Sequence, residues 1–184
     1  APLIAGDFGR FRRDYPKISL HIATGDTGML LEFLDHNEVD MICTMDDHVY
    51  DPNYIIANEE EIPAHFVASV KNPLSARRIR SVDELLDQPF LLTEKGMSYR
   101  RLMDEKLARN SREIQPVLET GRADLICALV EENAGIGFLP DYVTEESVRQ
   151  GKLKRLEVPD FEILVWKQVL HRREKWVSMQ MRAM

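Results

Sequence analysis

The period of the hydrophobic positions changes several times along the first third of the chain. One apolar face over residues 4–15 predicts a helix, which Pro16 ends because proline cannot continue the hydrogen-bond ladder. Alternation over residues 18–22 predicts a strand, and a leucine-rich face over residues 27–34 predicts a second helix. The apolar run 41–43 predicts a buried strand, so the order of elements is typical of α/β architecture.

The alternation of strands and helices starts again after Phe66, and this repetition predicts two lobes of similar design. The run Glu59–Glu61 between the two halves is expected to be a solvated acidic face. The strands predicted for the second half cover residues 66–70, 90–92, 116–118, 135–140 and 163–170. Four helices are predicted there: one that begins at the capping box of Ser81, one after the loop 93–98, one over residues 125–130 and one that begins near Lys175.

Composition and charge narrow the class of protein. The 184 residues are 44% hydrophobic and 30% charged, which is ordinary for a globular domain, and no apolar stretch is long enough for a membrane span. The sequence shows no charged start followed by an apolar run, so it does not predict a secretory signal. The formal net charge of -7 disfavours a surface for nucleic-acid phosphates. Cys43 and Cys127 fit a reducing cytosol, and we expect both to be buried packing residues.

The sequence contains no motif that predicts catalysis or a metal. There is no nucleophile elbow, no phosphate loop and no zinc-ligand spacing. None of His21, His36, His65 and His171 has neighbours that would make it a catalytic base. Residues 46–48 match a metal cluster only in composition, because adjacent residues on a loop rarely point at one ion. We therefore expect no cofactor, no metal and no enzymatic activity.

Several segments of the chain together resemble the effector-binding domain of LysR-type transcription regulators. None is specific alone, but they cover nearly all of the chain in the family's order and spacing. They are Arg10–Pro16 with its strand and the turn Gly25–Thr27, Leu30–Leu34 with Glu38–Met41, the turn Asn72–Leu74 (where the family usually has His-Pro-Leu), the stretch Leu129–Pro140, and His171–Trp176.

The resemblance implies a periplasmic-binding-protein type 2 fold, in which two crossover strands join two α/β lobes. Lobe I is expected at residues 1–64 plus 166–184, and lobe II at residues 65–165. A small-molecule effector would bind in the cleft between them and change the geometry of a cytoplasmic homodimer or homotetramer, with no membrane involved. The family's N-terminal winged helix-turn-helix and the sensing domain's first strand are not found here, so DNA would be contacted only by that other domain.

Helix starts on both lobes supply the predicted site for an anionic effector. Thr27 and the adjacent Asp26 lie at a helix N-terminus, where free N–H groups and the helix dipole favour a carboxylate. Alternatively, one of these two residues only caps the helix. On lobe II, Ser98 can cap the next helix while Lys95 and Arg100 add positive charge, or this loop is merely solvated. The full predicted set is Asp26, Thr27, Thr44, Thr93, Glu94, Lys95, Met97, Ser98, Tyr99, Arg100, Gly135, Ile136 and Gly137.

Two kinds of position in this set have structural alternatives. Thr44 follows the strand that is predicted to end at Cys43, where ligands of open α/β sheets tend to lie, or it satisfies its own strand end. Gly135 and Gly137, beside Ile136, allow a backbone to approach a ligand closely, or they simply bend a strand.

Two other functions are compatible with the same architecture. A solute-binding receptor of a transport system would need a signal peptide or lipid anchor upstream. An enzyme would need a reactive group between the lobes, and the sequence nominates none.

Overall fold

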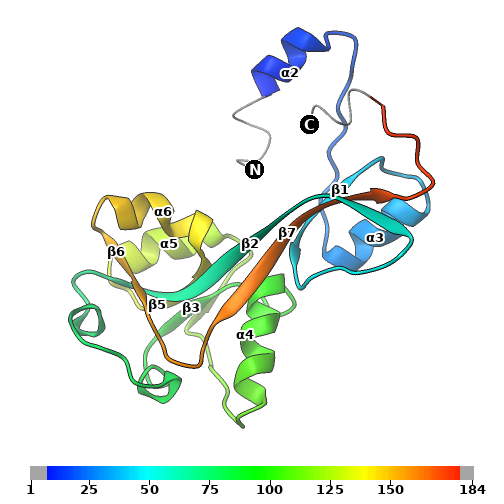
Figure 1. The fold of residues 1–184 in the computed structure, drawn as a ribbon. Coiled ribbons are helices and arrows are strands. Elements are labelled where there is room, and N and C mark those ends of the chain that lie inside the picture. Colours follow the sequence, from blue (N-terminus) through cyan, green and yellow to red (C-terminus); the bar gives the residue numbers. More distant parts are fainter. Residues whose placement is uncertain (1–7, 179–184) are drawn as a thin grey trace.

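Two long strands tie the molecule into the two-lobed α/β architecture that the sequence predicts (Figure 1). The computed structural model describes residues 8–178. β2 (Tyr54–Ser69) and β7 (Ile163–Arg172) pair antiparallel and run from one lobe into the other. The strand order is β1-β7-β2-β5-β3-β4, with β6 against β2. The expected lobe limits at 64/65 and 165/166 fall inside these two shared strands.

Lobe I is the smaller lobe and has its own hydrophobic core. It contains α3 (Thr27–Asp35) and β1 (Ile42–Asp46), and α2 (Phe8–Asp14) lies apart from its sheet (Figure 1). Leu34 of the helix packs on Ile42, Tyr54 and Leu170 of the strands. The predicted helix over residues 4–15 is confirmed in its described part, while Ile4 lies outside the described residues.

The predicted strand over residues 18–22 is wrong, because these residues have no regular secondary structure. Within residues 8–178, β1 pairs only with β7, so its other edge has no strand beside it. An alternating sequence becomes a strand only where its backbone groups find partners. Ile22 is consequently 60% exposed.

The predicted strand over 41–43 is confirmed but continues to Asp46. Successive side chains of a strand point to opposite faces, so Ile42 and Thr44 are buried while Cys43 is exposed. The expectation that Cys43 is buried is therefore wrong, and the expectation for Cys127 is confirmed.

Lobe II holds most of the core. Phe66 is at its centre and contacts the rings of Phe90, Phe138 and Phe161 at centroid distances of 5.9, 4.9 and 5.1 Å. α5 and α6 lie on one side of the strands and α4 on the other (Figure 1). The bounds of these elements are β3 (Phe90–Leu92), β4 (Leu118–Glu119), β5 (Ile136–Pro140), β6 (Leu153–Leu156), α4 (Ser98–Ala108), α5 (Ala123–Glu131) and α6 (Asp141–Arg149).

Two short 3-10 helices lie where the sequence predicts a turn at Asn72–Leu74 and a helix at Ser81. η1 (Pro73–Ala76) is capped by Asn72, whose side chain accepts from the Leu74 N–H. The helix predicted at Ser81 is only the turn η2 (Val82–Glu84), and the Ser81 side chain makes no cap hydrogen bond. Residues 175–178 are not helical, and the rest of the predicted last helix lies outside the described residues. No helix in the described part of the chain is long and apolar enough to cross a membrane.

Candidate functional site

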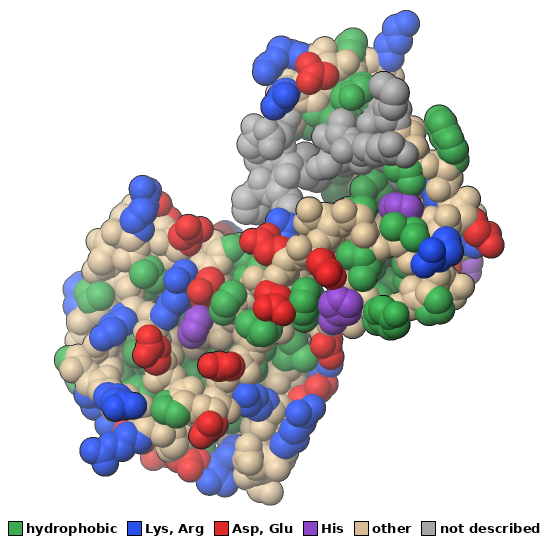
Figure 2. All heavy atoms as spheres, in the orientation of Figure 1, with side chains coloured by type: hydrophobic (Ala, Val, Ile, Leu, Met, Phe, Trp, Pro, Cys, Tyr) green, Lys and Arg blue, Asp and Glu red, His purple; other side chains and the backbone are tan. Residues whose placement is uncertain are grey.

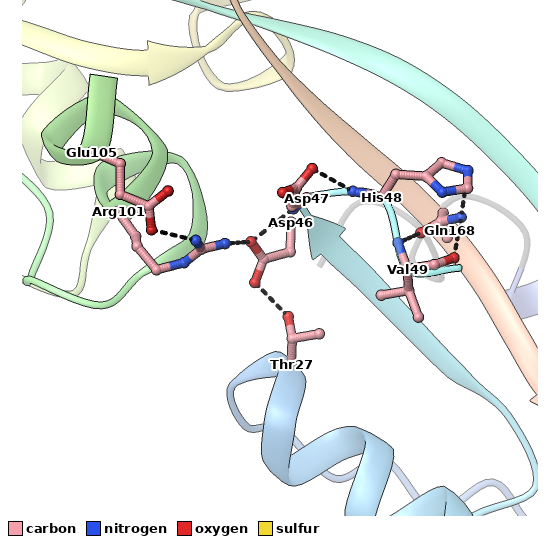
Figure 3. Close-up of polar contacts among 8 residues, drawn as sticks. All are labelled: Thr27, Asp46, Asp47, His48, Val49, Arg101, Glu105 and Gln168. Carbon is pink, nitrogen blue, oxygen red and sulfur yellow. Dashed lines mark hydrogen bonds and ion pairs between the residues drawn. The ribbon is translucent and has the colours of Figure 1, made fainter. Parts of the chain in front are cut away.

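The Asp46 carboxylate, at the end of β1, collects hydrogen-bond donors from both lobes (Figure 3). The hydroxyl of Thr27, the first residue of α3, donates to Asp46 Oδ2 at 2.8 Å. From lobe II, the guanidinium of Arg101 on α4 donates to Asp46 Oδ1 at 2.7 Å. The Asp47 N–H also donates to this oxygen at 2.7 Å. Asp46 is thus the point at which α3 and α4 meet.

Arg101 is held by two carboxylates. Its other terminal nitrogen donates to Glu105, one turn further along α4, at 2.6 Å. Pairing with Glu105 and with Asp46 raises the pKa of the Arg101 guanidinium above its ordinary value. The Arg101 side chain is 38% exposed and that of Asp46 is 16% exposed, so their contact lies at the solvent edge of the junction.

At the N-terminus of α3, Asp26 and Thr27 have different roles. Asp26 is the N-cap, and its carboxylate accepts from the Met29 N–H at 2.8 Å. The Thr27 hydroxyl is not used for capping and faces Asp46 instead. Because the first N–H groups of a helix have no partner within it, the turn keeps donors beside Thr27.

The loop of lobe II differs from its prediction at the helix start. Met97 occupies the N-cap position of α4, and Ser98 is the first helical residue, so the predicted Ser98 cap is wrong. Arg100 is 1% exposed and points into lobe II. It donates to both carboxylate oxygens of Asp104 at 2.9 and 2.8 Å and to the Thr93 carbonyl at 2.7 Å. The cation that faces lobe I is the neighbouring Arg101, which sequence reasoning missed.

Three predicted residues, Thr44, Thr93 and Tyr99, carry buried hydroxyls. The Thr44 hydroxyl has no hydrogen-bond partner in the described residues, whereas the Tyr99 and Thr93 side chains interact with each other. Thr44 lies inside β1 rather than after it, so its predicted place at the strand end is wrong. Burial raises the pKa of the Tyr99 phenol to about 12. Unsatisfied buried hydroxyls are costly and therefore mark positions where a bound molecule can supply the partner.

The remaining predicted residues lie in the core or on the surface of lobe II. Ile136 is fully buried in β5, and a Cβ at Gly137 would stand 3.2 Å from Val130 and Val67. A Cβ at Gly135 would lie 2.3 Å from the Pro89 carbonyl oxygen. The two glycines therefore allow close packing within lobe II. Lys95 and Glu94 are exposed, and the Glu94 carboxylate lies over Gly121.

The residues after Asp46 connect the junction to both shared strands, and Figure 3 draws the contacts to Gln168 of β7. The Val49 N–H donates to Gln168 Oε1 of β7 at 2.7 Å. His48 Nε2 lies 3.0 Å from Glu59 Oε2 of β2 and 3.1 Å from Gln168 Nε2. Side chains of the loop thus touch the crossover strands directly.

The other surface features contain fewer of the groups expected at a binding site. A hollow of about 760 Å³ is lined by Arg77, Arg78, Arg80, Glu84 and Pro159, and it contains none of the predicted ligand residues. Acidic side chains lie along the connection between the lobes on the face drawn in Figure 2, and residues 59–61 are exposed as expected. In residues 8–178, no group of three or more His, Cys, Asp or Glu could hold a metal ion.

Comparison with known proteins decides the family. The family model described as the LysR substrate binding domain matches residues 4–184. This chain belongs to that family. The family is one of ligand-binding domains of transcription regulators and not of enzymes, so the sequence-based expectations of the family and of a non-catalytic domain are confirmed.

Individual relatives agree with this assignment. The HTH-type transcriptional activator CmpR of Synechocystis is 25% identical over 170 residues, which are 92% of this chain and 56% of that protein. The chain therefore spans a little over half the length of the curated relatives it matches. The CcmR regulatory domain of Synechocystis in complex with 2-PG has a TM-score of 0.79 at 20% identity, covering 98% of this chain and 86% of its own. The effector-binding domain of QuiR in complex with shikimate has a TM-score of 0.72 at 14% identity, covering 98% and 85%. These two structures confirm the predicted fold.

Proposed function

We propose that this LysR substrate binding domain senses a small anionic metabolite, which binds where Thr27 of α3 and Arg101 of α4 converge between the lobes. The observation that carries the proposal is the pair of distances to Asp46, 2.8 Å from Thr27 and 2.7 Å from Arg101. A hydroxyl at a helix N-terminus and a guanidinium are the groups that proteins use to bind carboxylates. Family membership favours this regulator over the alternative of a solute-binding receptor.

Binding would act through the relative position of the two lobes. A ligand that contacts both α3 and α4 favours the lobe arrangement in which both contacts form. In the longer protein, a cytoplasmic homodimer or homotetramer, this shift would change the spacing of DNA-binding heads that lie outside these 184 residues. The net charge of -7 supports the view that this chain itself is not the DNA-binding surface.

A thermal-shift screen tests the proposal. The panel contains small carboxylates and phosphorylated acids, including shikimate and 2-PG. A ligand at about 100 times its dissociation constant adds about 2.7 kcal/mol to the free energy of unfolding and raises Tm by several degrees. Thr27→Val should weaken binding of a hit by about 1–3 kcal/mol, because a charge-assisted hydrogen bond is lost.

Thr24→Val is the matched control, since Thr24 is an exposed threonine in the preceding loop. It should leave the Tm shift unchanged. A hit whose affinity is the same in the Thr27→Val variant would place the effector elsewhere. A flat response to the whole panel would contradict an effector of this chemical class.

A further inference from the structure

The donors of the proposed site are already occupied by a carboxylate of the protein. Asp46 accepts the Thr27 hydroxyl with one oxygen, and Arg101 and the Asp47 N–H with the other, at 2.7–2.8 Å (Figure 3). A threonine hydroxyl has one hydrogen to donate. It cannot serve a second carboxylate while it donates to Asp46.

The net charge of the cluster also argues against an anion that binds beside Asp46. Asp46, Arg101 and Glu105 together carry one negative charge. An anion added beside them would bring two more carboxylate oxygens into a cluster that is already negative. If the anion replaces Asp46 instead, the charge around Arg101 stays the same and each donor keeps an acceptor.

We propose that Asp46 is an internal stand-in for the carboxylate of the effector, and that the effector binds by displacing it from Thr27 and Arg101. This inference rests on the proposed function and adds a chemical class and a means of regulation. Asp46 bridges the lobes through Thr27 and Arg101, and the effector would replace it in both contacts. Asp46 is the last residue of β1, and His48 and Val49, two and three positions later, contact the crossover strands.

The stand-in also sets specificity. A tethered group competes at an effective concentration on the order of millimolar or more. A minimal carboxylate such as acetate binds poorly against this competitor. The effector therefore carries a carboxylate together with further hydrogen-bonding groups.

Sodium acetate is the probe that tests the displacement, because it reproduces the Asp side chain. The 184-residue chain is titrated with acetate at constant ionic strength, and the backbone amide signals of Thr27 and Gly28 are followed by NMR. In Asp46→Ala, acetate should fill the vacated position with a dissociation constant at least about fivefold lower than in the wild type. Equal or weaker binding in Asp46→Ala, or saturable binding in neither protein, would overturn the proposal.

Matched variants separate displacement from a general charge effect. Asp47→Ala removes the same charge one residue away and should leave acetate binding as in the wild type, since among residues 8–178 the Asp47 side chain accepts only from the His48 N–H. In Asp46→Ala/Arg101→Gln the gain should disappear, because the freed cation is gone. A gain in Asp47→Ala, or one that persists without Arg101, also overturns the proposal. If Asp46→Ala does not fold, Asp46→Asn replaces it, because asparagine keeps the side-chain shape. Asp46→Asn should also lower the dissociation constant of acetate.

The acetate result and the metabolite screen can fail separately. If acetate binds only to Asp46→Ala but no panel member stabilises the wild type, the proposed effector class is contradicted, while the proposal that Asp46 occupies a carboxylate position is still supported. If a panel member binds through Thr27 but Asp46→Ala does not tighten acetate or that metabolite, the sensor function remains and the stand-in fails.

Discussion

Arg100 and Arg101 are adjacent in the sequence, but their side chains have opposite environments. Consecutive residues of an α-helix are rotated by about 100° around its axis, so one faces the core of lobe II when the other faces lobe I. Arg100 is 1% exposed and neutralised by Asp104 and Glu119. Arg101 reaches Asp46 across the junction. The first arginine stabilises its own lobe, whereas the second is available for exchange between carboxylates.

Tyr99, beside these arginines, gives a prediction for alkaline pH. Its phenol pKa is raised to about 12, mainly by burial, against about 10 in the unfolded chain. The folded state therefore holds the proton more tightly, and its stability falls as the pH rises from about 10 to 12, by about 2–3 kcal/mol in total. Tyr99→Phe should remove this part of the slope in urea unfolding followed between pH 8 and 11.

At pH 7 the phenol is protonated in both states, so the same variant loses only the contact between the Tyr99 and Thr93 side chains and should change stability by about 1 kcal/mol or less. Tyr54, whose pKa is raised to about 12 as well, is unchanged in both proteins and cancels in the comparison. A slope as steep as that of the wild type would show that Tyr99 does not titrate in this range.

Sequence reasoning correctly located the start of α3, because a local signal marks it. A Thr or Asp after a glycine and before a leucine-rich face marks a helix start, and this led to Asp26 and Thr27. No such signal separates Arg100 from Arg101, because the helix phase depends on whether the cap is Met97 or Ser98. Asp46 was considered only as a metal ligand, since its partners lie 19 and 55 positions away in the sequence.

At the scale of elements, the fully buried strands of lobe II were predicted closely, but the sequence predicted neither α6 nor β6, and only Leu118 of the strand predicted over 116–118 lies in β4. Strands such as Phe90–Leu92 and Ile136–Pro140 are buried on all sides, so their apolar runs are unambiguous. Residues 18–22 alternate equally well but have no strand to pair with in the described chain. Pairing is a property of the sheet, and a local pattern does not contain it.

Gly135 shows how tightly the strands of lobe II approach each other. A Cβ at this position would lie 2.3 Å from the Pro89 carbonyl oxygen, which also accepts the Ile136 N–H at 2.8 Å. Because the obstacle is backbone, Gly135→Ala must shift the start of β5 against β3, and we expect it to lower the free energy of unfolding by about 1–3 kcal/mol. Urea denaturation measures this loss.

Gly121→Ala serves as the control, because its nearest neighbour is the exposed, flexible Glu94 carboxylate at 3.4 Å. It should change stability by less than about 0.5 kcal/mol. Equal stability of the two variants would mean that β5 can move without cost and that Gly135 is not required for packing.

At the scale of the whole molecule, the two lobes are connected by β2 and β7 and by the contacts that cross between α3, β1 and α4. The two lobes have separate hydrophobic cores. A change at the junction can therefore alter how the lobes sit without disturbing either core. The resemblance to a known family predicted this organisation, and periodicity alone predicted only the two lobes.

Gln168 is the buried polar residue that connects the junction loop to β7. It is fully buried, accepts the Val49 N–H at 2.7 Å and donates to the Val49 carbonyl at 3.3 Å. Gln168→Met has a similar volume but leaves both backbone groups without their partner. We expect a loss of about 1–3 kcal/mol in the free energy of unfolding and faster hydrogen exchange at the Val49 amide.

Gln115→Met makes the same replacement at an exposed position and should change neither quantity. The pattern of amide hydrogen exchange is the measurement that decides, because it distinguishes local opening of the loop from a general loss of stability. If Gln168→Met speeds exchange at Val49 and leaves Leu34 of the lobe I core protected, the loop opens as a unit that binding at Asp46 can control. Uniformly faster exchange throughout lobe I would show instead that the loop and the core open together, and that displacement of Asp46 has no separate path to the shared strands.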